Sequence, residues 1–178
     1  MSIRPVLAVE LPETVVVTGA ASGLGLHLSR LLLAAGVVAI GVDLADPPDD
    51  LIAHRAYVHV AGDVADEVTW RTVAARIQDV GAGGSCMLGL ATSAAVLEVA
   101  TILQMSRESL MRLLEINVVG TALAMKAILP LMIARGGGSI VVVASVNATI
   151  AEQLLARVNG GSKPGRRGGV KAGHWIVT

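Results

Sequence analysis

The sequence predicts an α/β fold, a doubly wound parallel sheet of the Rossmann-like type with helices on both faces. Three observations lead to this prediction. The chain of 178 residues is 53% hydrophobic and only 2% aromatic, so its core is built from aliphatic side chains. Short β-branched segments alternate along it with longer segments whose apolar residues have helical spacing. Glycine-rich or turn-forming stretches separate the two kinds of segment.

Five short apolar segments are expected as buried strands. They lie at residues 15–18, 37–42, 57–61, 86–91 and 139–144. The first is a run of three valines that ends at Thr18 and Gly19, and the last reads Ser-Ile-Val-Val-Val-Ala. Strands that are apolar on both faces are typical of a parallel sheet covered by helices. The C-terminal strands that would complete a larger sheet of this type are missing from the pattern.

Three longer segments are expected as helices, at residues 24–35, 66–80 and 106–131. Gly36 stands where a helix commonly ends, and Asp66 and Ser106 stand where a side chain can cap the first turn. The sequence Asp-Pro-Pro-Asp-Asp at 46–50 predicts a turn. The alternation of strands and helices favours right-handed crossovers.

A cytoplasmic protein without a membrane partner is the default expectation, and the cysteine content leaves the redox compartment open. Mean hydropathy is +0.68, but the longest apolar run, residues 31–42, has 12 residues and contains two glycines. That length is too short to cross a bilayer. The N-terminus carries no signal-peptide pattern, and the single cysteine, Cys86, excludes an internal disulfide.

Acidic and basic residues are distributed unevenly along the chain. All 14 acidic residues and nine basic residues lie at or before Glu152, whereas residues 157–178 carry five basic residues and six glycines. We therefore expect a dinucleotide-binding core over residues 1–153 and an irregular, basic Gly/Arg-rich tail over 154–178. Three accounts of the tail remain open: a frameshift in the gene, a natural truncation, or a basic arm that contacts an anionic partner. Nucleic acid is the least favoured partner, because no aromatic platform accompanies the charges.

A glycine-rich turn joins the first strand to the first helix. It reads Thr18-Gly19-Ala-Ala-Ser22-Gly23-Leu24-Gly25. Glycines in this position let the backbone approach a diphosphate held at the helix N-terminus. A tight turn without a ligand is the alternative reading.

Asp43 ends the second strand, 18 residues after Gly25. A carboxylate there can accept hydrogen bonds from ribose hydroxyls and would repel a 2′-phosphate, which favours NAD over NADP. Asp46 is a weaker candidate for the same role, and a solvated turn aspartate is the alternative.

These motifs resemble the classical short-chain dehydrogenase/reductase family, whose fingerprint after the first strand is TGxxxGxG. Asp63-Val64 resembles the family's adenine-contacting pair after the third strand. Asn117 resembles the asparagine that supports a proton-relay water, and Ser145 resembles the catalytic serine that ends the fifth strand. The resemblance covers residues 12 to about 150 and implies cofactor binding by eight residues: Gly19, Ser22, Gly23, Leu24, Gly25, Asp43, Asp63 and Val64. Read singly, Asp63 could be a helix cap, Asn117 a core amide and Ser145 a strand-end hydroxyl.

Two segments depart from the family pattern. The family's Asn-Asn-Ala-Gly after the fourth strand is replaced by a segment containing Thr92 and Ser93. Ser162-Lys163 resembles the end of the family's Tyr-x-x-x-Lys, which puts Asn159 where the tyrosine belongs. An amide does not transfer protons at neutral pH, and loss of a general acid–base group lowers the rate by about 10²–10⁴-fold.

The resemblance implies an NAD-dependent oxidoreductase acting on an alcohol or carbonyl substrate, with Ser145, Asn117 and Lys163 as the catalytic positions. The missing tyrosine implies impaired activity. The alternative is a non-catalytic dinucleotide-binding protein. The histidines show no metal-ligand spacing, so no metal site is expected. Homo-oligomers are common in the family, and assembly of this chain is left open.

Overall fold

A computed structural model describes residues 11–80, 87–98, 103–145 and 170–177. A six-stranded sheet forms the centre, with the strand order β3-β2-β1-β4-β5-β6. The first five strands are all parallel. Their bounds are β1 Thr14–Thr18, β2 Val38–Asp43, β3 Tyr57–Ala61, β4 Leu88–Thr92 and β5 Gly138–Ser145. The parallel Rossmann-like sheet predicted from the sequence is therefore confirmed.

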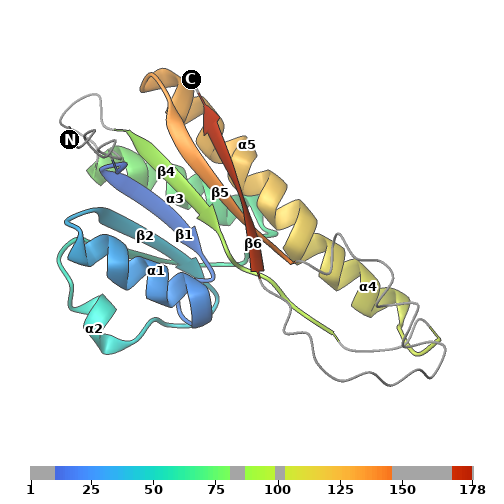
Figure 1. The fold of residues 1–178 in the computed structure, drawn as a ribbon. Coiled ribbons are helices and arrows are strands. Elements are labelled where there is room, and N and C mark those ends of the chain that lie inside the picture. Colours follow the sequence, from blue (N-terminus) through green and yellow to red (C-terminus); the bar gives the residue numbers. More distant parts are fainter. Residues whose placement is uncertain (1–10, 81–86, 99–102, 146–169, 178) are drawn as a thin grey trace, which may run out of the picture.

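Helices cover both faces of the sheet, as Figure 1 shows. On one face lie α1 Gly23–Ala34 and the short α2 Asp49–Ile52. On the other lie α3 Glu67–Val80 and a long helix made of α4 Arg107–Leu114, the π-helical segment η1 Glu115–Val119, and α5 Gly120–Ala134. α5 packs on the sheet, whereas α4 projects past the edge at which the parallel strands end.

The core consists of two aliphatic layers, one on each face of the sheet. The layer under α3 and α5 contains Trp70, Val73 and Ile128, all buried. The layer under α1 and α2 contains Leu32, Leu51 and Tyr57. The strands between them alternate their side chains into the two layers, which is why they read as unbroken apolar runs.

Capping side chains begin two helices where the sequence predicts. The hydroxyl oxygen of Ser106 accepts a hydrogen bond from the Ser109 backbone N–H at 3.0 Å. Asp66 Oδ1 accepts one from the Val68 N–H at 2.8 Å. Gly36 follows the end of α1 with φ +80°, a conformation that favours glycine.

Three elements differ from the expectation. The expected turn at 46–50 gives way to α2, because Pro48 precedes two aspartates that suit a first helical turn. The expected single helix at 106–131 is interrupted by η1 and continues past Pro130 to Ala134. The third difference concerns the tail.

The expectation of a tail without regular structure is wrong for residues 170–177. β6, Val170–Val177, pairs antiparallel with β5 over eight residues, from Gly138 opposite Val177 to Ser145 opposite Val170. Backbone pairing with the exposed side of β5 makes the strand, which a pattern within the segment itself does not reveal. The expected domain boundary at residue 153 lies outside the described residues and stays a prediction.

The long helix Arg107–Ala134 is long and apolar enough, by length and composition alone, to cross a membrane. In this fold its C-terminal part packs on the sheet, where Ala124, Ile128 and Met132 are fully buried. The apolar character of that part is therefore accounted for by the core.

Candidate functional site

A cleft of about 290 Å³ opens at the carboxyl edge of the parallel sheet. Its walls come from the segments after β1, β2, β3 and β4 and from the long helix. All eight residues that the sequence assigned to cofactor binding line it: Gly19, Ser22, Gly23, Leu24, Gly25, Asp43, Asp63 and Val64. In open α/β sheets, this edge is where ligands bind.

The glycine-rich turn is shaped by close backbone contacts. Gly19 has φ +68°, and a Cβ there would lie 2.9 Å from the Ala94 backbone. A Cβ on Gly25 would overlap the Gly19 carbonyl oxygen. Gly23, with φ +52°, has no atom within 4 Å of the place a Cβ would take. The turn is therefore packed tightly against β4 on one side and open on the other, as a diphosphate cradle requires.

The N-terminus of α1 faces this open side with its first N–H groups uncapped. Ser22 occupies the N-cap position, but its hydroxyl makes no capping hydrogen bond. The first turn carries no acidic residue. These N–H groups and the helix dipole favour an anion at this position.

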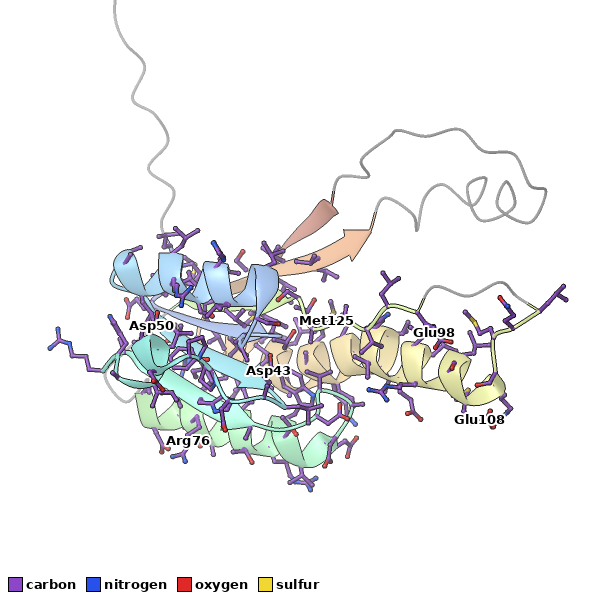
Figure 2. The ribbon with its side chains drawn as sticks, turned by 90° about the horizontal axis from the view of Figure 1, so that it is seen from below. Asp43, Asp50, Arg76, Glu98, Glu108 and Met125 are labelled. Carbon is purple, nitrogen blue, oxygen red and sulfur yellow. The ribbon has the colours of Figure 1, made fainter. Side chains whose placement is uncertain are left out.

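Asp43 is held in place by two backbone donors. Its Oδ2 accepts a hydrogen bond from the Ala21 N–H at 2.9 Å, and its Oδ1 accepts one from the Ala45 N–H at 3.0 Å. The first of these bonds connects the end of β2 to the glycine-rich turn. In Figure 2, Asp43 lies near the middle of the molecule, whereas Glu98 and Glu108 lie toward the projecting end of the long helix. Each carboxylate oxygen keeps a further lone pair for a ligand hydroxyl.

Asp63 and Val64 follow β3 at the same edge. Asp63 Oδ1 accepts a hydrogen bond from the Ala65 N–H at 2.8 Å, so this carboxylate also orders its own turn. Val64 packs against the long helix, where a Cβ on Gly120 would lie 2.7 Å from Val64 Cγ2. The glycine therefore lets the helix come close to the cleft.

Ser93 and Ala94 bond the end of β4 to the end of β1. The Ser93 and Ala94 N–H groups each donate to Thr18 Oγ1 at 3.0 Å, and the Ser93 hydroxyl donates to the Thr18 carbonyl. The end of β4 is thus fastened to the end of β1. The departure from the family pattern leaves this junction intact.

Asn117 lies on η1 and does not line the cleft. Its Oδ1 accepts from the Val96 N–H and its Nδ2 donates to the Val96 carbonyl, both at 2.9 Å. The Thr121 hydroxyl donates to the Asn117 carbonyl at 3.1 Å. The amide therefore holds the segment after β4 against the long helix, and the expected role in proton relay stays a prediction.

Ser145 is the last residue of β5. Thr92 at the end of β4 pairs with Val142, so Ser145 comes three residues later at the same carboxyl edge. Lys163 and Asn159 lie outside the described residues, and their roles stay predictions.

Tyr57, the single tyrosine of the chain, lies far from β5 in the sheet. It belongs to β3, and β2, β1 and β4 separate this strand from β5. Burial raises the pKa of its phenol to about 12, and the nearby Asp43 carboxylate adds to that shift. A phenol with that pKa is a poor proton-transfer group near neutrality.

Sequence reasoning missed part of the cleft wall, namely Val42, Leu44, Gly62, the segment 93–96, Arg112 and Ile116. Leu44 and Gly62 are next to predicted residues in the sequence, so they could have been predicted from that proximity. Arg112 is four residues before Ile116, and four-residue spacing puts both on one helix face. Only the packing of that helix beside Val64 shows that the face borders the cleft.

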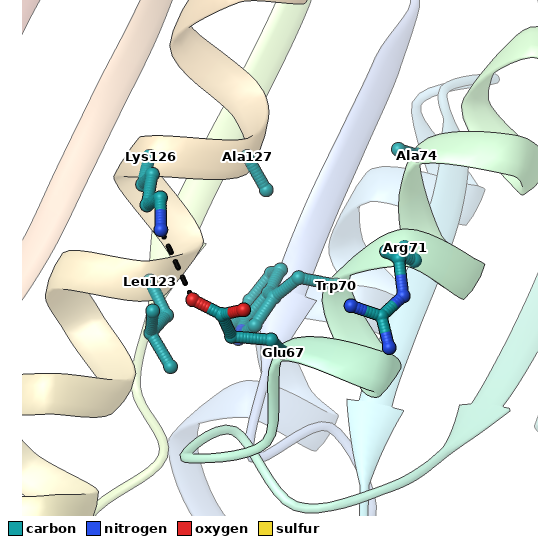
Figure 3. Close-up of a pocket in the computed structure, with 7 residues that line it drawn as sticks. All are labelled: Glu67, Trp70, Arg71, Ala74, Leu123, Lys126 and Ala127. Atoms are coloured by element: carbon teal, nitrogen blue, oxygen red, sulfur yellow. Dashed lines mark hydrogen bonds and ion pairs between the residues drawn. The ribbon is translucent and has the colours of Figure 1, made fainter.

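A second cavity, of about 250 Å³, lies between α3 and α5. Figure 3 shows its lining: Glu67, Trp70, Arg71, Ala74, Leu123, Lys126 and Ala127. The Lys126 ammonium donates to Glu67 Oε1 at 3.0 Å and holds the pKa of that carboxyl below its ordinary value. None of the predicted site residues lies there. In the part of the chain that the structure describes, no three His, Cys, Asp or Glu side chains group as metal ligands would.

Comparisons with known proteins agree with this geometry. Residues 13–170 match the family model described as short chain dehydrogenase. The chain is similar to the short chain dehydrogenase ausX of Aspergillus calidoustus, with 31% identity over 92% of this chain and 63% of the relative. It is also similar to the asnovolin H dehydrogenase nvfC of Aspergillus novofumigatus, with 30% identity over 90% of this chain and 62% of the relative. The chain thus spans somewhat less than two thirds of the length of these relatives.

Two solved structures share the fold. One is a short-chain dehydrogenase from Streptomyces avermitilis, with 30% identity and a TM-score of 0.63 over 72% of this chain and 48% of the other. The other is a short chain dehydrogenase from Leptospira borgpetersenii with bound NAD+, with 16% identity and a TM-score of 0.61 over 70% of this chain and 48% of the other.

Proposed function

The chain belongs to the short-chain dehydrogenase family, and from this premise we propose that it binds NAD in the cleft at the carboxyl edge of the sheet. The proposed reaction is hydride exchange between the nicotinamide and a small alcohol or carbonyl substrate. Dehydrogenase relatives support a small-molecule substrate. A cytoplasmic location and the absence of a membrane partner belong to the same proposal.

The observation that carries the proposal is the convergence of eight residues on one cleft. They come from three separate loops, which the parallel sheet brings to the same edge. The glycine-rich turn offers space for a diphosphate, and the uncapped N-terminus of α1 offers hydrogen-bond donors to it. Asp43 offers acceptors for the ribose hydroxyls. The solved Leptospira structure with bound NAD+ shares this fold and supports the choice of a nicotinamide dinucleotide.

Charge supports NAD over NADP. Asp43 is fixed beside the glycine-rich turn, and the residues after it, Leu44 and Ala45, are uncharged. A carboxylate at this point repels a 2′-phosphate, and an NADP site typically offers an arginine nearby. Of the described residues that line the cleft, Arg112 alone is basic, and it belongs to the long helix rather than to the β2 loop.

The chain's own residues would take the remaining roles. Ser145, at the end of β5, would hold the substrate oxygen, and Asn117 would keep the β4 segment against the long helix. Bound NAD supplies the hydride acceptor. Lys163 would contribute a positive charge near the substrate, as the family resemblance implies. Since Tyr57 is remote from β5 and its pKa is raised to about 12, we propose that turnover is low.

A second candidate is a dinucleotide-binding protein without catalysis. It is favoured by the same observation on Tyr57, because binding requires the cleft alone whereas catalysis requires a proton-transfer group beside Ser145.

The test compares NADH and NADPH by fluorescence titration of the wild-type chain and of Gly25→Ala. We expect NADH to bind more tightly than NADPH, and Gly25→Ala to lose binding because its Cβ overlaps the Gly19 carbonyl. Gly36→Ala is the matched control, since it strains the other end of α1 without entering the cleft. Absence of NADH binding by the wild type would contradict the proposal. Turnover assays over a panel of alcohols and ketones then separate the enzyme from the non-catalytic binder.

A further inference from the structure

Arg112 is the only positively charged side chain among the described residues of the cleft. The other charged residues that line it are Asp43 and Asp63, and both accept backbone hydrogen bonds. Arg112 lies on α4 and is exposed. Within residues 11–80, 87–98 and 103–145, its side chain makes no ion pair and no hydrogen bond. The guanidinium is therefore available to a ligand.

The long helix places Arg112 at the β3 side of the cleft. Arg112, Ile116 and Gly120 follow one another at four-residue spacing, and the first two line the cleft. Gly120 packs against Val64, directly after β3. Gly120 therefore lies beside Val64, and Ile116 and then Arg112 follow on the same helix face, farther from the sheet. The glycine-rich turn after β1 lies two strands away in the order β3-β2-β1.

This separation decides which part of a dinucleotide Arg112 can meet. The diphosphate is matched by the turn after β1 and the N-terminus of α1, and the ribose by Asp43 at the end of β2. The adenine base is the part of the dinucleotide left to occupy the β3 side of the cleft. Ile116 and Val64 offer it an apolar floor. A planar guanidinium stacks on an aromatic face, whereas a lysine ammonium provides the charge without the plane.

We propose that Arg112 stacks on the adenine ring of the bound dinucleotide and closes the outer end of its pocket. This inference rests on the proposed function, since it requires a dinucleotide in the cleft. It adds a specificity-determining residue on the long helix.

The test measures affinities of wild type, Arg112→Ala and Arg112→Lys for NADH, ADP-ribose and reduced nicotinamide mononucleotide. We expect Arg112→Ala to weaken NADH and ADP-ribose equally, by about 2- to 30-fold, and to leave the mononucleotide unchanged. Arg112→Lys should recover only part of the loss. Arg76→Ala, an exposed arginine of α3 outside the cleft, is the control and should match the wild type.

The outcomes separate the two proposals. If the wild type binds NADH and Arg112→Ala binds it equally well, the role of Arg112 is refuted and the proposed function stands. If Arg112→Lys restores full affinity, or if the mononucleotide is weakened as well, the contact is with a phosphate and adenine stacking is refuted. If the wild type binds no NADH, both proposals fail.

Discussion

Tyr57 is a buried phenol whose oxygen has no hydrogen-bond partner among the described residues. The ring fills the layer under α1 and α2, and the hydroxyl lies against Gly41, where a Cβ would overlap it. A buried hydroxyl without a partner costs about 1–3 kcal/mol. The ring therefore stabilises the core while its oxygen destabilises it.

We expect Tyr57→Phe to change how stability depends on pH. The folded pKa of about 12 lies above the ordinary value of 10.0, so the unfolded chain loses the phenol proton first. Stability of the wild type should fall between about pH 10 and pH 12, by up to about 2 to 3 kcal/mol. Urea unfolding followed by circular dichroism from pH 8 to 11.5 measures this. The difference between wild type and Tyr57→Phe should grow above pH 10, and a constant difference would show that the phenol keeps an ordinary pKa in the fold.

Ser93 illustrates which features of the site could be predicted from single residues and which could not. The departure from the family pattern at Ser93 is visible in the sequence. The bond from its hydroxyl to the Thr18 carbonyl is not, because it joins residues 75 positions apart and depends on the register of β1 with β4. The eight residues proposed to bind the cofactor could be placed at one edge of the sheet because they belong to short motifs that directly follow strands. Arg112 could not, because its link to the cleft is a tertiary contact of the helix that bears it.

At the scale of elements, η1 is the part of the long helix that bonds to the segment after β4. π-helical turns are frequent at functional sites, and this one carries Asn117, whose amide makes two hydrogen bonds to the Val96 backbone. α4, before it, has no buried residue, whereas α5, after it, is anchored in the core. Among the described residues, the two bonds link the segment after β4 to the long helix at η1.

Asn117→Ala should loosen that segment locally. Loss of two hydrogen bonds is worth about 1–3 kcal/mol, which corresponds to roughly 5- to 150-fold faster opening at Val96. Hydrogen exchange read by mass spectrometry should show faster exchange in peptides covering residues 93–98, with α1 peptides unchanged as the internal control. If the 93–98 peptides exchange as in the wild type, Asn117 does not hold this segment.

The strands were predictable and the irregular elements were not, for physical reasons. The five parallel strands are short apolar runs, and β1, β2 and β4 are almost wholly buried, so each can be recognised from its own residues. η1 carries Asn117, whose amide bonds to the Val96 backbone 21 positions away, and β6 pairs with β5. α2 is one turn long, and its aspartates suit a turn as well as a first helical turn.

At the scale of the whole molecule, the proposed ligand joins three loops and a helix, so its binding should stabilise the entire fold. At a concentration of 100 times Kd, a ligand specific to the folded state adds about 2.7 kcal/mol. For a chain of this size that raises Tm by about 5–10 °C. Thermal unfolding at increasing NADH should show this rise in the wild type and not in Gly25→Ala. An unchanged Tm at NADH concentrations that saturate the fluorescence signal would contradict it.

The strand order has a consequence for the nascent chain on the ribosome. β1, β2 and β3 are consecutive neighbours on one side of the sheet, and they carry the wall made by residues 19 to 64. The opposing wall, from 93 to 116, is translated later and must dock on the other side of β1. The wall formed by residues 19 to 64 is therefore synthesised first, and the cleft is complete only after the long helix has left the exit tunnel.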